Sequence, residues 1–224
     1  MEITPVAYFK SPFPDKFGIP RQAGLVEGLR GRIVFAPGFK SADAIRGLEG
    51  FEYIWLIWGF SANTASIGKT AFQATVRPPR LGGNERVGVF ASRSPFRPNG
   101  LGLSSVKVVS IDFDGPAIEV DGADLMDGTP IYDIKPYVEY TDSHPGVRSG
   151  FVDSHGWEPL EVVFPEDASS SGIDLKVLAD VLSLDPRPKD QDDPLKVYGM
   201  TFGGHEIRFK VVGKVLTVLE IVPH

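Results

Sequence analysis

Apolar residues along the chain gather in short runs separated by glycine and proline, a pattern typical of β-strands joined by tight turns. The run from residue 51 to 60 is apolar at both alternating sets of positions except at Glu52. Both faces of this strand should therefore be covered, which places it centrally in a sheet or barrel, with Trp55 and Trp58 as core residues. Further strands are predicted at 6–9, 31–35, 87–91 and 104–111.

Three Asp-Gly pairs, at 114–115, 121–122 and 127–128, divide the segment that follows. Glycine accepts a positive φ without penalty, so such pairs between extended segments are typical of hairpin turns. A meander of antiparallel strands leads to a barrel or a sandwich and not to a doubly wound sheet. Earlier in the chain, Ser41 is expected to cap a short helix that runs to Leu48.

The pattern changes near residue 150. Ser171-Gly172-Ile173-Asp174 resembles a capping box, and the apolar residues behind it lie on one helical face: Val177, Leu178, Val181 and Leu182. Residues 195–222 then alternate as two or three strands, with turns at Gly203-Gly204 and Gly213-Lys214. We therefore expect a mainly β protein, with an antiparallel β-barrel domain over residues 1–149 and a small α+β domain over residues 150–224.

The composition excludes several classes of protein. Because the chain has no cysteine and its four histidines show no metal-ligand spacing, we expect neither disulfides nor a metal site. Residues 1–10 lack the basic flank and apolar run of a signal peptide, and the longest apolar run, around 54–58, is too short to span a bilayer. We therefore expect a cytoplasmic protein without a membrane partner.

Charge is distributed unevenly along a chain whose net charge is −6. From Lys69 to Lys107, seven lysines and arginines stand against Glu85 alone, which gives +6 and leaves −12 for the rest of the chain. A basic face on an acidic protein suits a polyanion that is held at one place. The same arginines also fit a scattered, solvated surface.

Two proline-rich loops, 77–84 and 92–100, are the most unusual segments. Proline fixes φ and extends the residue before it, so these loops should hold their arginines with little left to order on binding. A guanidinium pairs bidentately with carboxylate or phosphate, which predicts an anion site, although at least one arginine should pair with a core carboxylate instead. The arginines in and between these loops are Arg77, Arg80, Arg86, Arg93 and Arg97.

Other ligand-binding and catalytic motifs find no support. Gly100-Leu101-Gly102-Leu103 lacks the third glycine and the following helix of a dinucleotide-binding loop. The chain contains neither a P-loop nor the Gly-x-Ser-x-Gly elbow of a hydrolase. NTPase and hydrolase functions therefore have no positive support.

Several longer segments carry a family resemblance. They are Pro20-Arg21-Gln22, Arg46-Gly47-Leu48-Glu49, the stretches 76–84 and 88–99, Asp127-Gly128-Thr129-Pro130 and Asp133-Ile134-Lys135-Pro136-Tyr137. These segments resemble the signature motifs of the TrmO (YaeB/TsaA-like) family of tRNA methyltransferases. The resemblance covers residues 1–142 closely and the tail more loosely, mainly through Asp185-Pro186-Arg187-Pro188.

The resemblance implies a homodimeric β-barrel enzyme whose barrel domain binds S-adenosylmethionine and carries the active site. Its implied reaction is methylation of N6 of threonylcarbamoyl-adenosine beside the tRNA anticodon. The cofactor contacts that it implies are Pro20, Arg21, Gln22, Ser61, Ala62, Arg93, Leu103, Leu125, Met126, Asp127, Gly128 and Thr129. The family often has His-Gln where this chain has Ser61-Ala62.

The chemistry of methyl transfer agrees with the residues present. An exocyclic amine needs mainly to be aligned with the S–CH₃ bond, and its proton leaves after transfer, so no strong base is required and no catalytic residue is predicted. Arg21 or Arg93 would hold the donor's carboxylate. Asp127 would attract its cationic end, or would serve only to form the turn.

The tRNA partner implied by the resemblance offers phosphates and a threonyl carboxylate. The candidates to bind the anticodon loop are Arg77, Arg80, Arg86 and Arg97. Two alternatives remain. In a methyltransferase of a small molecule the arginine-rich face would be unnecessary, and a non-catalytic RNA-binding barrel would bind no cofactor.

Overall fold

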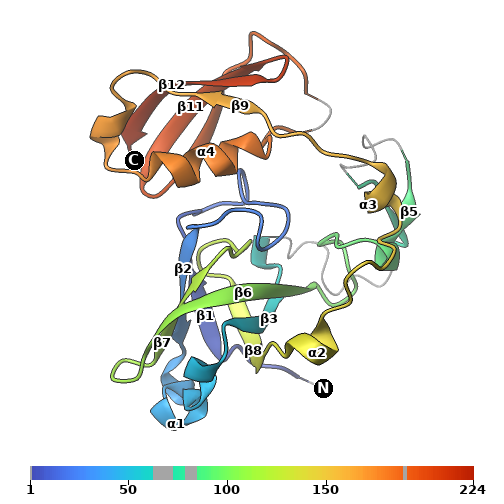
Figure 1. The fold of residues 1–224 in the computed structure, drawn as a ribbon, viewed down its shortest axis with the longest axis vertical. Coiled ribbons are helices and arrows are strands. Elements are labelled where there is room, and N and C mark those ends of the chain that lie inside the picture. Colours follow the sequence, from blue (N-terminus) through green and yellow to red (C-terminus); the bar gives the residue numbers. More distant parts are fainter. Residues whose placement is uncertain (1, 63–72, 79–84, 189–190) are drawn as a thin grey trace.

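The computed structural model describes residues 2–62, 73–78, 85–188 and 191–224. Figure 1 shows two β-rich units, the barrel in blue to yellow and a smaller unit in orange and red above it. The chain passes from one to the other through the short helices α2 (Glu139–Asp142) and α3 (Phe151–Ser154). The mainly β fold predicted from the sequence is confirmed.

The first unit is a closed barrel of six strands in the order β1-β2-β7-β6-β3-β8. Every neighbouring pair is antiparallel. The strands are β1 (Ala7–Lys10), β2 (Arg30–Phe35), β3 (Tyr53–Gly59), β6 (Leu101–Asp112), β7 (Ala117–Asp121) and β8 (Pro130–Pro136). Alternate residues of these strands point inward and form one apolar core.

Strand β3 occupies the central position predicted for it, because it pairs with β6 on one side and β8 on the other. Ile54, Leu56 and Trp58 face the barrel core, where Trp58 is 7% exposed. Trp55 is half-buried on the opposite face of the strand and donates its Nε1–H to Asp142, 2.9 Å away. Trp58 is therefore a core residue as expected, whereas Trp55 packs outside the barrel.

Only the first Asp-Gly pair forms a predicted hairpin turn, between β6 and β7. Strand β7 has β2 as its other neighbour, and β8 pairs with β1 and β3, so residues 122–129 cross one end of the barrel instead. Because the barrel closes in this order, β7 and β8 follow each other in sequence but are not neighbours in the sheet. Gly122 and Gly128 still adopt positive φ, both 75°.

Two local predictions were wrong. In the predicted strand 87–91, only β5 (Val87–Gly88) is extended and pairs with β4 (Thr75–Val76), while Val89–Ala91 forms a 3₁₀ turn. Helix α1 (Ala42–Ile45) is shorter than expected, and the Ser41 side chain makes no capping bond. Gly47 at φ 92° separates α1 from a 3₁₀ turn at Leu48–Gly50.

The second unit is a four-stranded sheet with one helix against it. Its strands lie in the order β10-β11-β12-β9, and β9 runs parallel to β12, which the sequence did not predict. Their bounds are β9 (Glu161–Val163), β10 (Tyr198–Phe202), β11 (His205–Val212) and β12 (Val215–Pro223). The turns predicted at 203–204 and 213–214 both connect antiparallel strands.

Helix α4 (Leu175–Ser183) buries the apolar face predicted from its sequence, because Val177, Leu178, Val181 and Leu182 are all in the core. Asp174 is itself the cap: its Oδ1 accepts hydrogen bonds from the N–H groups of Lys176 and Val177. The predicted capping box, with Ser171 as its cap, was therefore displaced by three residues.

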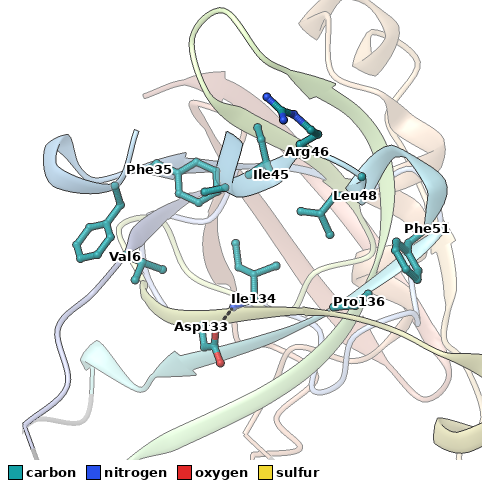
Figure 2. A pocket seen from close by; sticks show the side chains of 12 residues that line it. Val6, Phe35, Ile45, Arg46, Leu48, Phe51, Asp133, Ile134 and Pro136 are labelled. Atoms are coloured by element: carbon teal, nitrogen blue, oxygen red, sulfur yellow. Dashed lines mark hydrogen bonds between the residues drawn. The ribbon is translucent and has the colours of Figure 1, made fainter. Parts of the chain in front are cut away.

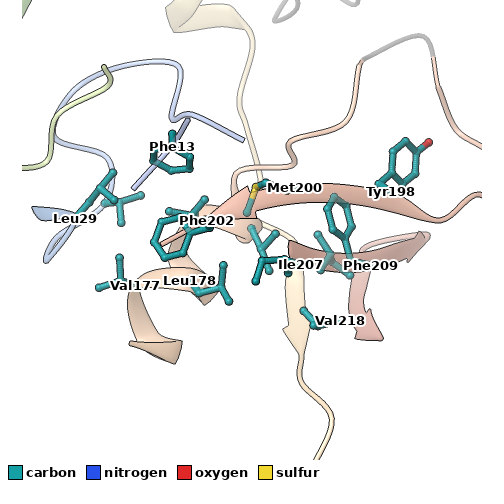
Figure 3. Packing of buried hydrophobic residues seen from close by; sticks show 14 of the residues in the cluster. Phe13, Leu29, Val177, Leu178, Tyr198, Met200, Phe202, Ile207, Phe209 and Val218 are labelled. Atoms are coloured by element: carbon teal, nitrogen blue, oxygen red, sulfur yellow. The ribbon is translucent and has the colours of Figure 1, made fainter. Parts of the chain in front are cut away.

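The connection between β1 and β2 belongs structurally to both units. Its residues Phe13, Val26 and Leu29 are buried in the core of the second unit, as Figure 3 shows for Phe13 and Leu29. The Phe13 ring meets Phe202 edge-on at a centroid distance of 5.2 Å. A domain division between residues 149 and 150 remains a prediction, and this connection contributes to cores on both sides of it.

Candidate functional site

The predicted cofactor residues that the structure describes lie in or beside the connections at one end of the barrel. This end holds the exits of β1, β3 and β7 and the entries of β2, β6 and β8. The second unit sits beyond the same end, with residues 11–29 between the two (Figure 1).

The segment Pro20–Gln22 is held against the crossing 122–129. Pro20 is buried, and Gly24 donates its N–H to the carbonyl of Gly122 over 2.8 Å. A Cβ on Gly122 would lie 3.3 Å from the Cα of Gly24, so the two backbones approach closely. Within the segment, the Gln22 Oε1 accepts a hydrogen bond from the Arg93 guanidinium. The structure thus brings the predicted residues Gln22 and Arg93 together.

The turn 125–129 is fastened to the end of β1. The Asp127 Oδ1 accepts the N–H of Ser11 over 3.0 Å, and its Oδ2 lies 3.5 Å from the Nζ of Lys10. Thr129 is 2% exposed and Leu125 packs in the barrel core, so neither side chain is open to a ligand. These contacts match the interpretation of Asp127 as a turn-forming residue and leave its cofactor role a prediction.

Three other predicted residues flank the same end. Leu103, near the start of β6, points out of the barrel and is 59% exposed. Ser61 and Ala62 follow β3 after one residue, Phe60, whose N–H donates to the carbonyl of Gly100 over 2.9 Å. Their side chains are half-buried and exposed, respectively.

Sequence reasoning missed Asp124, the polar residue most firmly built into this end. Its Oδ1 accepts the hydroxyl hydrogen of buried Ser104 over 2.6 Å, and the Ser104 Oγ accepts the Nε1–H of Trp58 over 3.0 Å. Burial raises the pKa of the Asp124 carboxyl, opposed by the Ser104 bond, by backbone N–H groups including that of Ala23, and by the Arg93 charge. The sequence signal available was a carboxylate between the apolar residues Ala123 and Leu125.

The four arginines predicted to bind tRNA have different surroundings. The half-buried Arg97 donates to the carbonyl of Ser92 over 2.7 Å and stiffens the loop 92–100. Arg77 and Arg86 are exposed and flank the β4–β5 ribbon, opposite each other by continuation of its register. Arg80 lies outside the described residues. Of the arginines that the structure describes in this region, none forms an ion pair with a described carboxylate. The expected pairing of at least one arginine with a core carboxylate stays a prediction, because it also includes Arg80.

Comparison with known proteins identifies the family. The model of the tRNA-methyltransferase O N-terminal domain matches residues 8–143, and that of the TrmO C-terminal domain matches residues 158–224. The chain belongs to the tRNA-methyltransferase O family. The family resemblance read from the sequence is thereby confirmed.

Relatives of this chain cover most of its length. The tRNA (adenine(37)-N6)-methyltransferase of Escherichia coli is 34% identical over 97% of this chain and 96% of its own. A Pseudomonas aeruginosa protein, provisionally named S-adenosylmethionine-dependent methyltransferase RcsF, is 36% identical over 88% of this chain and 87% of its own. A crystal structure of TrmO from Pseudomonas aeruginosa superposes with a TM-score of 0.79 at 29% identity, covering 100% and 97% of the two chains.

A separate concavity of about 460 Å³ lies at the opposite end of the barrel, between α1 and β8 (Figure 2). Its walls are mostly apolar, with Phe35, Ile45 and Leu48 facing Ile134. The Asp133 carboxylate at its edge accepts the N–H of Ile134 over 2.9 Å. None of the predicted site residues lines this concavity, so it is distinct from the candidate site.

Two structural features are absent from the described part of the chain. No helix there is both long and apolar enough to cross a membrane. Within the same residues, no group of three or more histidine, aspartate or glutamate side chains is placed to hold a metal ion.

Proposed function

We propose that this chain is an S-adenosylmethionine-dependent tRNA methyltransferase that methylates N6 of threonylcarbamoyl-adenosine next to the anticodon. The observation that carries the proposal is the match to the E. coli tRNA (adenine(37)-N6)-methyltransferase over nearly all of both chains. The threonylcarbamoyl group, the homodimer and the cytoplasmic location belong to the proposal through the family resemblance.

The residues at the barrel end fit the proposed cofactor. S-adenosylmethionine carries a carboxylate, an ammonium and a sulfonium, and supplies an electrophilic methyl group when bound. Arg93 shares its guanidinium only with the neutral Gln22 among the contacts described, so it can exchange that partner for a carboxylate and gain a charge-assisted bond. The Asp124 carboxylate nearby has the sign that the cationic groups require.

The chain's part in the proposed reaction is to bind and orient. The N6 lone pair of the acceptor is delocalised into the purine ring, so alignment and proximity can supply much of the acceleration. Hydrogen bonds of the Ser92 hydroxyl hold the loop around Arg93 in place. The Ser92 Oγ donates to the Val89 carbonyl and accepts the N–H of Ser94. The proton released after transfer can leave to solvent without a dedicated base.

The acceptor's phosphates and carboxylate call for positive charge. Arg77 and Arg86 offer it on an exposed ribbon. Within the part of the chain that the structure describes, Arg86 bonds to a neutral group, the Thr75 hydroxyl, 3.0 Å away. An anticodon-loop base is unpaired, so extruding it into a pocket requires less energy than from a duplex. This supports a nucleic acid as the acceptor over a small molecule.

The experiment that tests the function is transfer of labelled methyl from S-adenosylmethionine to tRNA purified with and without threonylcarbamoyl-adenosine. We expect label only in the modified tRNA, with the label mapping to the nucleoside 3′ of the anticodon. Equal labelling of both tRNAs would contradict the proposed substrate. Labelling of neither, with cofactor binding confirmed by calorimetry, would contradict tRNA as the acceptor.

A further inference from the structure

Asp124 joins the separate segments of the candidate donor site. The Ala23 N–H, which bonds its carboxylate, directly follows Pro20–Gln22, and Ser104, which donates to it, directly follows Leu103. The turn 125–129 continues from Asp124 along the chain. One carboxylate therefore bonds to the residues that directly follow two of the predicted cofactor segments, and it directly precedes the third.

The carboxylate also acts on Arg93 without forming an ion pair with it. The Arg93 charge lowers the pKa of Asp124, yet no guanidinium or ammonium of the described residues lies within 4.0 Å of its oxygens. The guanidinium is bonded to Gln22 instead. A carboxylate and a guanidinium that interact without forming an ion pair suit a zwitterionic ligand, whose ammonium can face the carboxylate and whose carboxylate can face the guanidinium.

The environment of Asp124 is unfavourable to its own charge. Burial raises its pKa, so the ionised form is less stable in the folded chain than in the unfolded one, and folding is weakened at neutral pH. A group that weakens the fold and is nevertheless anchored by Ser104 and Trp58 is typical of a functional site. A residue serving only the fold would be expected to lower the energy of the folded state.

We propose that Asp124 is the positioning residue of the methyl-donor site, and that its negative charge makes the site prefer the cationic donor to its neutral product, S-adenosylhomocysteine. The proposal rests on the proposed function, because it assumes that the donor binds at this barrel end. Donor and product differ by the sulfonium charge and one methyl group, so their affinity ratio reports directly on the charge that the site presents.

The test uses Asp124→Asn, which removes the charge and keeps an oxygen for Ser104. Asp114→Asn is the matched control, because Asp114 is exposed in the hairpin turn between β6 and β7 at the opposite barrel end. Calorimetry on the full chain measures the Kd of S-adenosylmethionine and of S-adenosylhomocysteine. We expect Asp124→Asn to weaken donor binding on the order of tenfold, as for one charge acting over several ångströms. Product binding should change by about twofold or less, Tm should not fall, and the control should bind as wild type.

Equal losses for both ligands, or no loss for either, would overturn the role of Asp124. If Asp124→Asn does not fold, the same affinity ratio is measured on the wild-type chain as pH is lowered. The preference for the donor should then disappear as the carboxylate is protonated, above the ordinary aspartate value of 3.8. A constant ratio would overturn the proposal. Wild-type protein that binds neither ligand would contradict the donor site itself, a result seen without any variant.

Discussion

Arg93 and Arg97 show how residues of one type, four positions apart, take different roles. Arg97 is half-buried and satisfies a backbone carbonyl of its own loop, and its guanidinium lies 6.0 Å from the centre of the Phe90 ring. Arg93 is exposed and reaches across to Gln22, 71 residues away in sequence. The first arginine holds the loop and the second is available to a ligand.

Arg93→Ala is expected to weaken S-adenosylmethionine binding. A hydrogen bond to a charged group contributes about 1.5–3 kcal/mol, which corresponds to roughly a 10- to 100-fold rise in Kd. Arg93→Lys should recover only part of the affinity, because an ammonium cannot pair bidentately. Calorimetry provides the Kd. Arg32→Ala is the control, since Arg32 is an exposed residue of β2 that lies in none of the predicted site segments and pairs with Asp112 and Glu119. An Arg93→Ala chain with wild-type affinity would remove Arg93 from the site.

At the scale of elements, the connection 11–29 couples the second unit to the cofactor segment. The Phe13 ring is buried against the second unit's core, while the Phe13 carbonyl accepts the N–H of Asp127 over 2.8 Å. Gly203, in the turn between β10 and β11, donates its N–H to the Pro12 carbonyl over 2.9 Å. Displacing this connection from the second unit should therefore also disturb Pro20–Gln22.

Gly18 is the position where this coupling can be tested. It has φ 88°, and an added Cβ would lie 2.0 Å from the sulfur of Met200, which is 2% exposed and has little room to move. Gly24 has φ 79° with nothing within 4 Å of such a Cβ, so Gly24→Ala reproduces the backbone strain without the clash. We expect Gly18→Ala to lower the free energy of unfolding by about 1–3 kcal/mol more than Gly24→Ala does.

Donor affinity should fall more in Gly18→Ala than in Gly24→Ala as well. Urea unfolding and calorimetric binding measure the two effects on the same samples. If the two variants lose stability and affinity equally, contact with the second unit does not support the cofactor segment.

The strands were predictable where local pattern decides them. Strand β3 is apolar on both faces, and α4 has its apolar residues at helical spacing, so both were found from the sequence. The order of the barrel strands depends on pairings between residues far apart in sequence, which is why two Asp-Gly pairs were mistaken for hairpins. The 3₁₀ turn at Val89–Ala91 replaced a predicted strand because the β4–β5 pairing ends at Gly88.

The candidate site was likewise predictable only where the local sequence carries a motif. Its segments were identified by family motifs, but Asp124 becomes a desolvated carboxylate only when Ala23 and Ser104 meet it in the folded chain. The contact of Asp124 with these two residues could not be predicted from their spacing along the sequence. Likewise, nothing in the local sequence around Phe13 indicated that this residue would enter the core of the second unit.

At the scale of the whole molecule, a net charge of −6 must be reconciled with a polyanionic partner. Long-range repulsion falls off within about 10 Å at 0.1 M salt, so the local surface decides binding. Arg77 and Arg86 project from a ribbon that lies beside the barrel, near β5 in Figure 1, and not from its core. Arginines elsewhere are often neutralised: Arg208 pairs with Glu206 and Glu220, and Arg187 with Asp185 and Asp192.

The ribbon should therefore govern how tRNA binding depends on salt. Each phosphate contact contributes roughly 0.7–0.9 to the slope of log K against log salt concentration, so Arg77→Ala/Arg86→Ala should reduce the slope by about 1.4–1.8. Fluorescence anisotropy with labelled tRNA over a salt series measures the slope.

Arg208→Ala is the control: it removes one positive charge from the second unit and should leave the slope unchanged, because Glu206 and Glu220 already neutralise Arg208. S-adenosylmethionine affinity should stay at the wild-type value in all these variants. A slope that stays at the wild-type value in the double variant would place the phosphate contacts on another surface. A slope that also falls in Arg208→Ala would indicate an effect of net charge and not of contacts made by the ribbon.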